Sequence, residues 1–152
     1  MNIYLAADHG GFKLKEHLEN ILSSENHEIV DLGPATTDPI DDYPDFAFSV
    51  AQAVANEKDS LGLLLCRSGQ GVCVVANKIA GVRAAVAWNE EVARAGRRDD
   101  HINVLCLPSD YVSQKEAEKI VQAWLNAKPG QDERYMRRLE KIKAIEEHSK
   151  NY

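Results

Sequence analysis

The stretch LGLLLCRSGQGVCVVANKIA, residues 61–80, joins a strand to a helix through a glycine turn that follows a cysteine. The five apolar residues before Cys66 predict a buried strand, and the turn SGQG (68–71) opens an apolar helix. A helix N-terminus directs unpaired N–H groups at a bound anion, and Gly69 and Gly71 let the backbone approach a ligand closely. In this field the Cys66 thiol should ionise more easily than a free thiol. The pattern predicts a small anion site, although an inert buried cysteine before an ordinary turn fits it as well.

Apolar runs alternate with helical periodicity along the whole chain. The predicted strands cover residues 2–7, 27–32, 61–65, 83–87 and 103–107, and the predicted helices cover 12–22, 46–55, 72–79, 90–97, 113–125 and 133–147. Parallel neighbours need helical crossovers, so this order predicts a Rossmann-like α/β fold, a three-layer α/β/α sandwich with a five-stranded parallel sheet. At 152 residues we expect a single domain over 1–152, ending in a C-terminal amphipathic helix.

The composition narrows the class of protein. Eighteen basic and 24 acidic side chains give a net charge of −6, which argues against a nucleic-acid or membrane surface. No apolar run approaches the ~18 residues of a membrane span, and the short N-terminal run lacks the features of a signal peptide. The three cysteines, Cys66, Cys73 and Cys106, show neither paired nor zinc-like spacing. We therefore expect a cytoplasmic protein with reduced thiols and no metal.

Ligands of open α/β sheets bind beyond the carboxyl ends of the strands. This rule is expected to gather three segments in one crevice: Asp8 with His9, residues 66–71, and residues near 99–103. A thiol, an imidazole, a carboxylate and an amide-lined turn can abstract a proton next to a carbonyl and stabilise the enediolate. The same groups would suit nucleophilic thiol chemistry, and Asp-His before two glycines is equally compatible with helix capping.

Spacing excludes three related signatures. A cysteine phosphatase needs an arginine where Val72 stands. A Walker loop fails because Gly69 and Gly71 are not followed by Gly-Lys-Ser/Thr. The third glycine of a dinucleotide fingerprint is replaced by Val74, and the motif lies on the third strand instead of the first.

Five segments occur in order over nearly the whole chain: DHGGFKLKE, YPDFA, CRSGQGVCVVANKIAGVRAA, NVLCLP and ERYMRRLEKI. Together they resemble the ribose-5-phosphate isomerase B / galactose-6-phosphate isomerase family, and the central block is highly specific. The resemblance implies isomerisation of a phosphorylated sugar without metal or organic cofactor, most directly of ribose 5-phosphate to ribulose 5-phosphate through a cis-enediolate. It also implies a site at the interface of a homodimer, or of a dimer of dimers. The pattern alone equally allows the C-terminal helix to pack on its own subunit.

The resemblance implies roles for individual residues. Cys66 matches the base that moves a proton between C1 and C2, and Ser68 stands where a threonine usually assists this step. The implied substrate contacts are the turn amides of Gly69, Gln70 and Gly71, then Asp8 for a sugar hydroxyl, His9 near the phosphate, and Arg134 with Arg138 for the phosphate. The two arginines are four residues apart, so they share one helix face, although solvent-facing charge is the alternative.

Several positions depart from the family pattern. Asp99 and Asp100 replace a His-Asn pair that usually opens the furanose ring, so Asp99 is the candidate for this step and Asp100 for a neighbouring substrate contact. Asp99 would need burial to raise its pKa, unless His101 substitutes or the substrate needs no opening. Asp110 replaces a phosphate-binding arginine, a contact worth about 1.5–3 kcal/mol, while Arg67 replaces a glycine. Either Arg67 compensates, or the site accepts another sugar such as allose 6-phosphate or galactose 6-phosphate, or the chain binds sugar phosphates without turnover.

Overall fold

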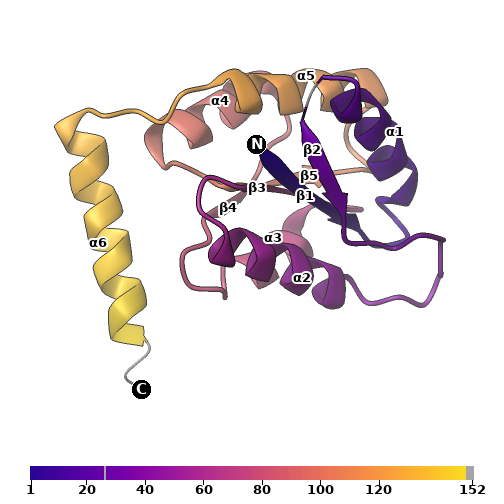
Figure 1. The fold of residues 1–152 in the computed structure, drawn as a ribbon, viewed down its shortest axis with the longest axis horizontal. Coiled ribbons are helices and arrows are strands. Elements are labelled where there is room, and N and C mark those ends of the chain that lie inside the picture. Colours follow the sequence, from indigo (N-terminus) through magenta and orange to yellow (C-terminus); the bar gives the residue numbers. More distant parts are fainter. Residues whose placement is uncertain (26, 150–152) are drawn as a thin grey trace.

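A computed structural model describes residues 1–25 and 27–149 and shows a parallel sheet covered by helices (Figure 1). The strands are β1 (Asn2–Ala7), β2 (Glu28–Asp31), β3 (Leu61–Cys66), β4 (Ala84–Val86) and β5 (Val104–Pro108). The helices are α1 (Phe12–Ser23), α2 (Tyr43–Asn56), α3 (Gln70–Ala76), α4 (Glu90–Asp99), α5 (Gln114–Asn126) and α6 (Glu133–Ser149). Each predicted strand and helix is found, with ends shifted by a few residues.

The sheet is parallel throughout, in the order β2-β1-β3-β5-β4, and β3 is its central strand. Every residue of β3 is buried, as a strand covered on both faces requires, and the apolar run LGLLLC meets that requirement. One core joins the sheet to α1, α4 and α5, and a second joins its other face to α2 and α3 (Figure 1). The predicted three-layer α/β/α sandwich is confirmed.

Strands β1, β3 and β5 end together at the carboxyl edge of the sheet. Ala7 pairs with Leu65, and Cys66 pairs with Pro108. The pairing continues past the strand ends, because the Ser109 amide donates to the Cys66 carbonyl at 2.9 Å. The segments that follow these strands therefore lie side by side, as expected for the turn at Cys66.

Residues 99–103 lie at the opposite, amino edge. They precede β5, whose first residue, Val104, pairs with Gly62 near the start of β3. The Gly62 amide donates to the Asn103 carbonyl at 2.8 Å. Four residues of strand separate this pairing from Cys66, which at about 3.3 Å per residue is ~13 Å. The expectation that residues 99–103 share a crevice with Cys66 in one chain is therefore wrong, because this segment enters a strand instead of leaving one.

Helix α6 stands beside the layers, beyond the edge where the strands begin (Figure 1). Tyr135 is buried at its start, and the Glu146 carboxylate accepts the Gly81 amide at 2.8 Å near its end. Its predicted apolar stripe is largely uncovered, with Ile142 43% and Ile145 67% exposed. Among the described helices, none is both long and apolar enough to cross a membrane.

Candidate active site

The Cys66 side chain lies at the end of the central strand and is 5% exposed. Its Sγ accepts the Gly69 N–H at 3.1 Å, so the turn holds a backbone donor against the thiol. Gly69 has φ +72°, and a Cβ there would approach the carbonyl carbon of Leu107 to 3.1 Å. Glycine satisfies both constraints, which explains its place in this turn. The neighbouring Ser68 Oγ accepts the Gln70 amide at 3.3 Å.

Two side chains lie directly over glycine backbone at this edge. A Cβ on Gly71 would be 2.5 Å from the ring of Tyr43, and a Cβ on Gly10 would be 2.5 Å from Cγ of Arg67. Tyr43 begins α2 and is 39% exposed, so its ring forms a wall of the turn. Sequence reasoning missed Tyr43 as a site residue, although the YPDFA segment that contains it was a signal.

Asp8 and His9 follow β1 at the same edge. Asp8 is 7% exposed, and its Oδ1 accepts the Gly11 amide at 3.1 Å, just before α1. The His9 Nδ1 donates to Oδ1 of Asp41 at 2.6 Å, and the His9 backbone N–H donates to the same oxygen at 3.2 Å. The ligand atoms of Asp8, His9 and Asp41 lie within 4.8 Å of one another, a spacing that a metal ion could also use. Asp41 was not predicted; its only signal was the Asp-rich loop before α2.

Two buried side-chain atoms at this edge have no hydrogen-bond partner within residues 1–25 and 27–149: Oδ2 of Asp41 and Oγ of Ser109. Asp41 contacts His9 after β1, and Ser109 bonds to Cys66 through its backbone, so the two atoms flank the turn region. A buried polar atom without a partner costs about 1–3 kcal/mol, and such atoms call for an explanation such as a bound molecule. These two atoms indicate that the carboxyl edge of the sheet has a role other than stability.

Arg67 and Asp110 form a charge pair across the ends of β3 and β5. The Asp110 amide donates to the Arg67 carbonyl at 2.9 Å, and the side chains approach to 3.4 Å. Their side chains are 64% and 44% exposed, so the pair contributes little to stability. The Arg67 guanidinium, after β3, lies beside Asp110, after the adjacent strand β5, and Asp110 occupies the position of the arginine in the family pattern.

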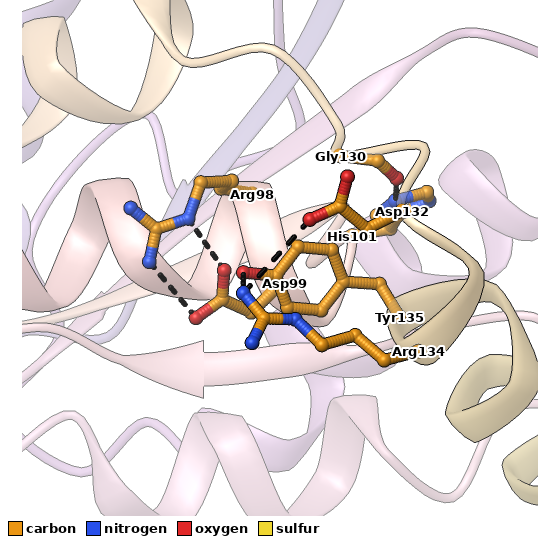
Figure 2. Close-up of polar contacts among 7 residues, drawn as sticks. All are labelled: Arg98, Asp99, His101, Gly130, Asp132, Arg134 and Tyr135. Carbon is orange, nitrogen blue, oxygen red and sulfur yellow. Dashed lines mark hydrogen bonds and ion pairs between the residues drawn. The ribbon is translucent and has the colours of Figure 1, made fainter.

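A second polar cluster lies at the amino edge (Figure 2). Asp99 accepts two hydrogen bonds from Arg98, at 2.5 and 3.0 Å, and these bonds lower the pKa of the Asp99 carboxyl. Arg134 donates to the Tyr135 hydroxyl at 2.9 Å and lies 3.9 Å from the Asp132 carboxylate. The hydrogen bonds from Arg98 lower the pKa of Asp99 more than its partial burial raises it, so this carboxyl is ionised in the single chain.

The other predicted amino-edge residues differ in their contacts. His101 donates from Nε2 to the Gly130 carbonyl at 2.7 Å, since a carbonyl oxygen only accepts (Figure 2). Asp100 ends α4, and both it and Arg138 are exposed. Among the described residues, neither side chain forms an ion pair that would fix its geometry.

The predicted site residues thus form two groups. The carboxyl edge holds Asp8, His9, Cys66, Arg67, Ser68, Gly69, Gln70 and Gly71, and the amino edge holds Asp99, Asp100, His101 and the start of α6 with Arg134. The first group brings together a thiol, a carboxylate, an imidazole and backbone donors, which is a set for proton transfer next to a carbonyl. The second group combines carboxylates with arginines and does not reach the first within one chain.

Comparison with known proteins identifies relatives over almost the full length. The Ribose/Galactose Isomerase family model matches residues 3–142. The probable ribose-5-phosphate isomerase B of Mycoplasma genitalium is 45% identical over 142 residues, which is 93% of both chains. Ribose-5-phosphate isomerase B of Escherichia coli K12 is 37% identical over 145 residues, 95% of this chain and 96% of that one.

Solved structures agree with these sequence matches. Ribose-5-phosphate isomerase B from Mycoplasma genitalium with bound ribulose-5-phosphate superimposes with a TM-score of 0.93 at 44% identity, covering 96% of each chain. The isomerase B from Clostridium thermocellum gives a TM-score of 0.92 at 37% identity, covering 98% of this chain and 99% of that one. The expected enzyme class, an aldose–ketose sugar-phosphate isomerase, is confirmed by these matches, and the chain belongs to the ribose/galactose isomerase family.

Proposed function

We propose that this protein interconverts ribose 5-phosphate and ribulose 5-phosphate through an enediolate, with Cys66 as the base. The observation that carries the proposal is a buried thiol held against the Gly69 amide, at the edge that also holds Asp8 and His9. A relative 44% identical to this chain binds ribulose-5-phosphate, which makes that sugar the first candidate. The cysteines are free thiols, which suits a reducing cytoplasm.

The proposed chemistry needs one base that reaches two adjacent carbons. The Cys66 thiolate removes a proton from the carbon next to the carbonyl and returns it to the neighbouring carbon. The turn amides of residues 69–71 stabilise the enediolate oxygens, because backbone donors fixed by a glycine turn need no reorganisation when charge develops. The Ser68 hydroxyl can rotate away from its contact with the Gln70 amide and assist proton transfer between the two oxygens.

The phosphate needs more positive charge than Arg67 alone supplies at this edge. Arg134 and Arg138 lie on α6, beyond the amino edge, so we assign them to the site of a second copy in a homodimer. A two-fold axis can bring the amino edge of each chain to the carboxyl edge of the other. The uncovered apolar residues of α6, among them Ile142 and Ile145, favour a second copy as the surface on which they pack.

Arg67 is the candidate for the cation lost at Asp110. Its contact with Asp110 is long, at 3.4 Å, and solvent-exposed, so a phosphate could displace it at little cost. If the phosphate does not displace it, the acidic Asp110 weakens phosphate binding and favours a different sugar phosphate. Allose 6-phosphate and galactose 6-phosphate are the alternatives to assay.

The test measures isomerisation of all three sugar phosphates and solvent exchange of the C2 proton by NMR in deuterated water. Cys66→Ala should abolish exchange while the thermal unfolding temperature stays near that of the wild type. Cys73→Ala is the matched control, because it removes another thiol of the same sequence block and should retain turnover. Exchange at the wild-type rate in Cys66→Ala would refute the base, and ligand-induced stabilisation without exchange for any sugar would favour a binding protein.

A further inference from the structure

The contact between His9 and Asp41 points to a role that lies outside the roles already assigned. We propose that Asp41 is a positioning residue, which holds the His9 imidazole with a proton on Nδ1 and leaves Nε2 for the substrate. The assignment of His9 to substrate rests on the proposed function. The orientation and protonation of the ring rest on geometry alone.

The hydrogen bonds define which ring nitrogen carries the proton. Oδ1 of Asp41 lies 2.6 Å from Nδ1 of His9 and 3.2 Å from the His9 backbone nitrogen. A carboxylate only accepts hydrogen bonds, so Nδ1 of His9 is the donor. Because the His9 backbone N–H donates to the same carboxylate oxygen, the ring is also fixed relative to the His9 backbone. Among the described residues, none is recorded as a partner of Nε2, and the His9 side chain is 28% exposed. The open nitrogen of the ring is therefore Nε2.

The Asp41 carboxylate is unusual because it is buried. The Asp41 side chain is 8% exposed, and its second oxygen, Oδ2, is buried without a partner. The Asp41 backbone is itself fixed, because its amide donates to the Asp38 carbonyl at 3.1 Å. His9 is thus the residue that the buried Asp41 carboxylate contacts and orients. An unpartnered buried oxygen costs about 1–3 kcal/mol, so this residue serves a role other than stability, and the contact at its other oxygen, Oδ1, is with His9.

The arrangement has a chemical consequence at Nε2. With Nδ1–H committed to Asp41, the ring presents Nε2 as its free nitrogen, toward the phosphate near which the family resemblance places His9. When Nε2 takes up a proton, the carboxylate stabilises the imidazolium, and the ring then donates to an anionic oxygen. Without Asp41 the ring is free to turn and to place its proton on the other nitrogen. Asp41 thereby acts through His9 and not by touching the substrate.

The experiment reads the His9 tautomer and the kinetics in the same variants. Asp41→Leu removes both acceptor oxygens while keeping the branching of the side chain, and Asp41→Asn, which matches aspartate in size, keeps a neutral acceptor oxygen in case the larger leucine does not fold. Long-range proton–nitrogen NMR spectra of histidine-labelled protein, assigned with His9→Gln, should show Nδ1–H in the wild type and Nε2–H in Asp41→Leu. We expect kcat/KM for ribose 5-phosphate to fall about tenfold or more in Asp41→Leu and less in Asp41→Asn. Asp42→Asn, the adjacent exposed carboxylate, is the control that should change neither readout.

Each outcome decides the proposal. An Nε2–H tautomer in the wild type overturns it, as does an unchanged tautomer in both Asp41 variants. A tautomer that switches in Asp41→Leu without any loss of kcat/KM also overturns it, because the orientation would then be irrelevant to the reaction. If the wild type isomerises none of the three sugar phosphates, the proposed function fails, while the spectra still decide whether Asp41 sets the state of His9.

Discussion

Two inactive variants should restore each other's activity if the carboxyl edge of one chain works with the amino edge of another. Cys66 pairs with Pro108, whereas the segment that enters β5 at Val104 lies about 13 Å away along the strand. Cys66→Ala removes the proposed base. The double variant Arg134→Ala/Arg138→Ala removes two proposed phosphate contacts, a loss on the order of 3–6 kcal/mol that lowers turnover at least ~100-fold.

The size of the recovery follows from symmetry. Equal amounts of the two variants, after subunit exchange, give half heterodimers, and each heterodimer has one site with both lesions and one intact site. The mixture should therefore regain about one quarter of the wild-type activity. The assay follows ribose 5-phosphate isomerisation before and after exchange, with native mass spectrometry to measure the heterodimer fraction.

The control mixes two variants that are both altered at the carboxyl edge. Cys66→Ala mixed with Cys66→Ser leaves every site without the thiol, so no recovery is expected. If heterodimers of the first pair form in the expected proportion and activity stays at the sum of the parents, the shared site is refuted. In that case Arg134 and Arg138 must act within their own chain, or have no part in catalysis.

Three further perturbations test local features. A hydrogen bond from the Cys106 thiol lowers the pKa of Cys73 to about 7, so the rate of Cys73 alkylation should rise with a midpoint near pH 7. Cys106→Ala should move this midpoint to higher pH. An unchanged midpoint would contradict the assigned cause. Since the folded pKa lies below the ordinary value of 9.0, the thiolate stabilises the fold fully above pH 9, and this contribution is lost as the pH falls through 7. The buried Lys15 ammonium donates to the Asp31 carboxylate at 2.5 Å and to the Pro34 carbonyl at 3.0 Å. Asp31→Asn should cost about 3–5 kcal/mol in urea unfolding because it leaves the buried Lys15 charge without its carboxylate, whereas Lys15→Met should cost less, since the partly exposed Asp31 can be hydrated; equal costs would count against the pairing. Gly11→Ala places a Cβ 2.7 Å from the β3 backbone, and a loss of unfolding free energy below the expected ~1–3 kcal/mol would show that the backbone yields.

The layers were predictable because local signals and burial agree along this chain. The run that ends at Cys66 is apolar at each position except one glycine, and the structure buries all of it between helices. Ser113 and Glu116 have the three-residue spacing of a capping box, and both of its reciprocal hydrogen bonds are formed. Helix α4 carries its acidic residues in the first turn and its basic residues in the last, as the helix dipole favours. Patterns of this kind depend on residues that are close in sequence, and these local residues determine where the helices and strands form.

The site was predictable only where it follows a strand directly. Asp8 and Cys66 leave neighbouring strands, so the rule for parallel sheets placed them together. Asp41 reaches His9 across 32 residues of sequence through an irregular loop, and neither periodicity nor spacing encodes such a contact. The apolar stripe of α6 was visible as a pattern, but the pattern does not say which chain covers it.

The two edges also bear on how the sugar ring opens. Ring opening needs a group that removes the proton of the anomeric hydroxyl and another that protonates the ring oxygen. Hydrogen bonds from Arg98 lower the pKa of Asp99, so this carboxylate has no proton to give the ring oxygen and is a weak base for the anomeric hydroxyl. His101 has its Nε2 proton committed to Gly130, which leaves a lone pair at Nδ1 and no free donor in the neutral ring. Neither group of the amino edge is therefore an acid in the isolated chain. In a dimer that joins the edges, the imidazole on the facing side is His9, which Asp41 holds through Nδ1, so a donor for the ring oxygen would have to come from the other chain or from the substrate's own surroundings at that edge.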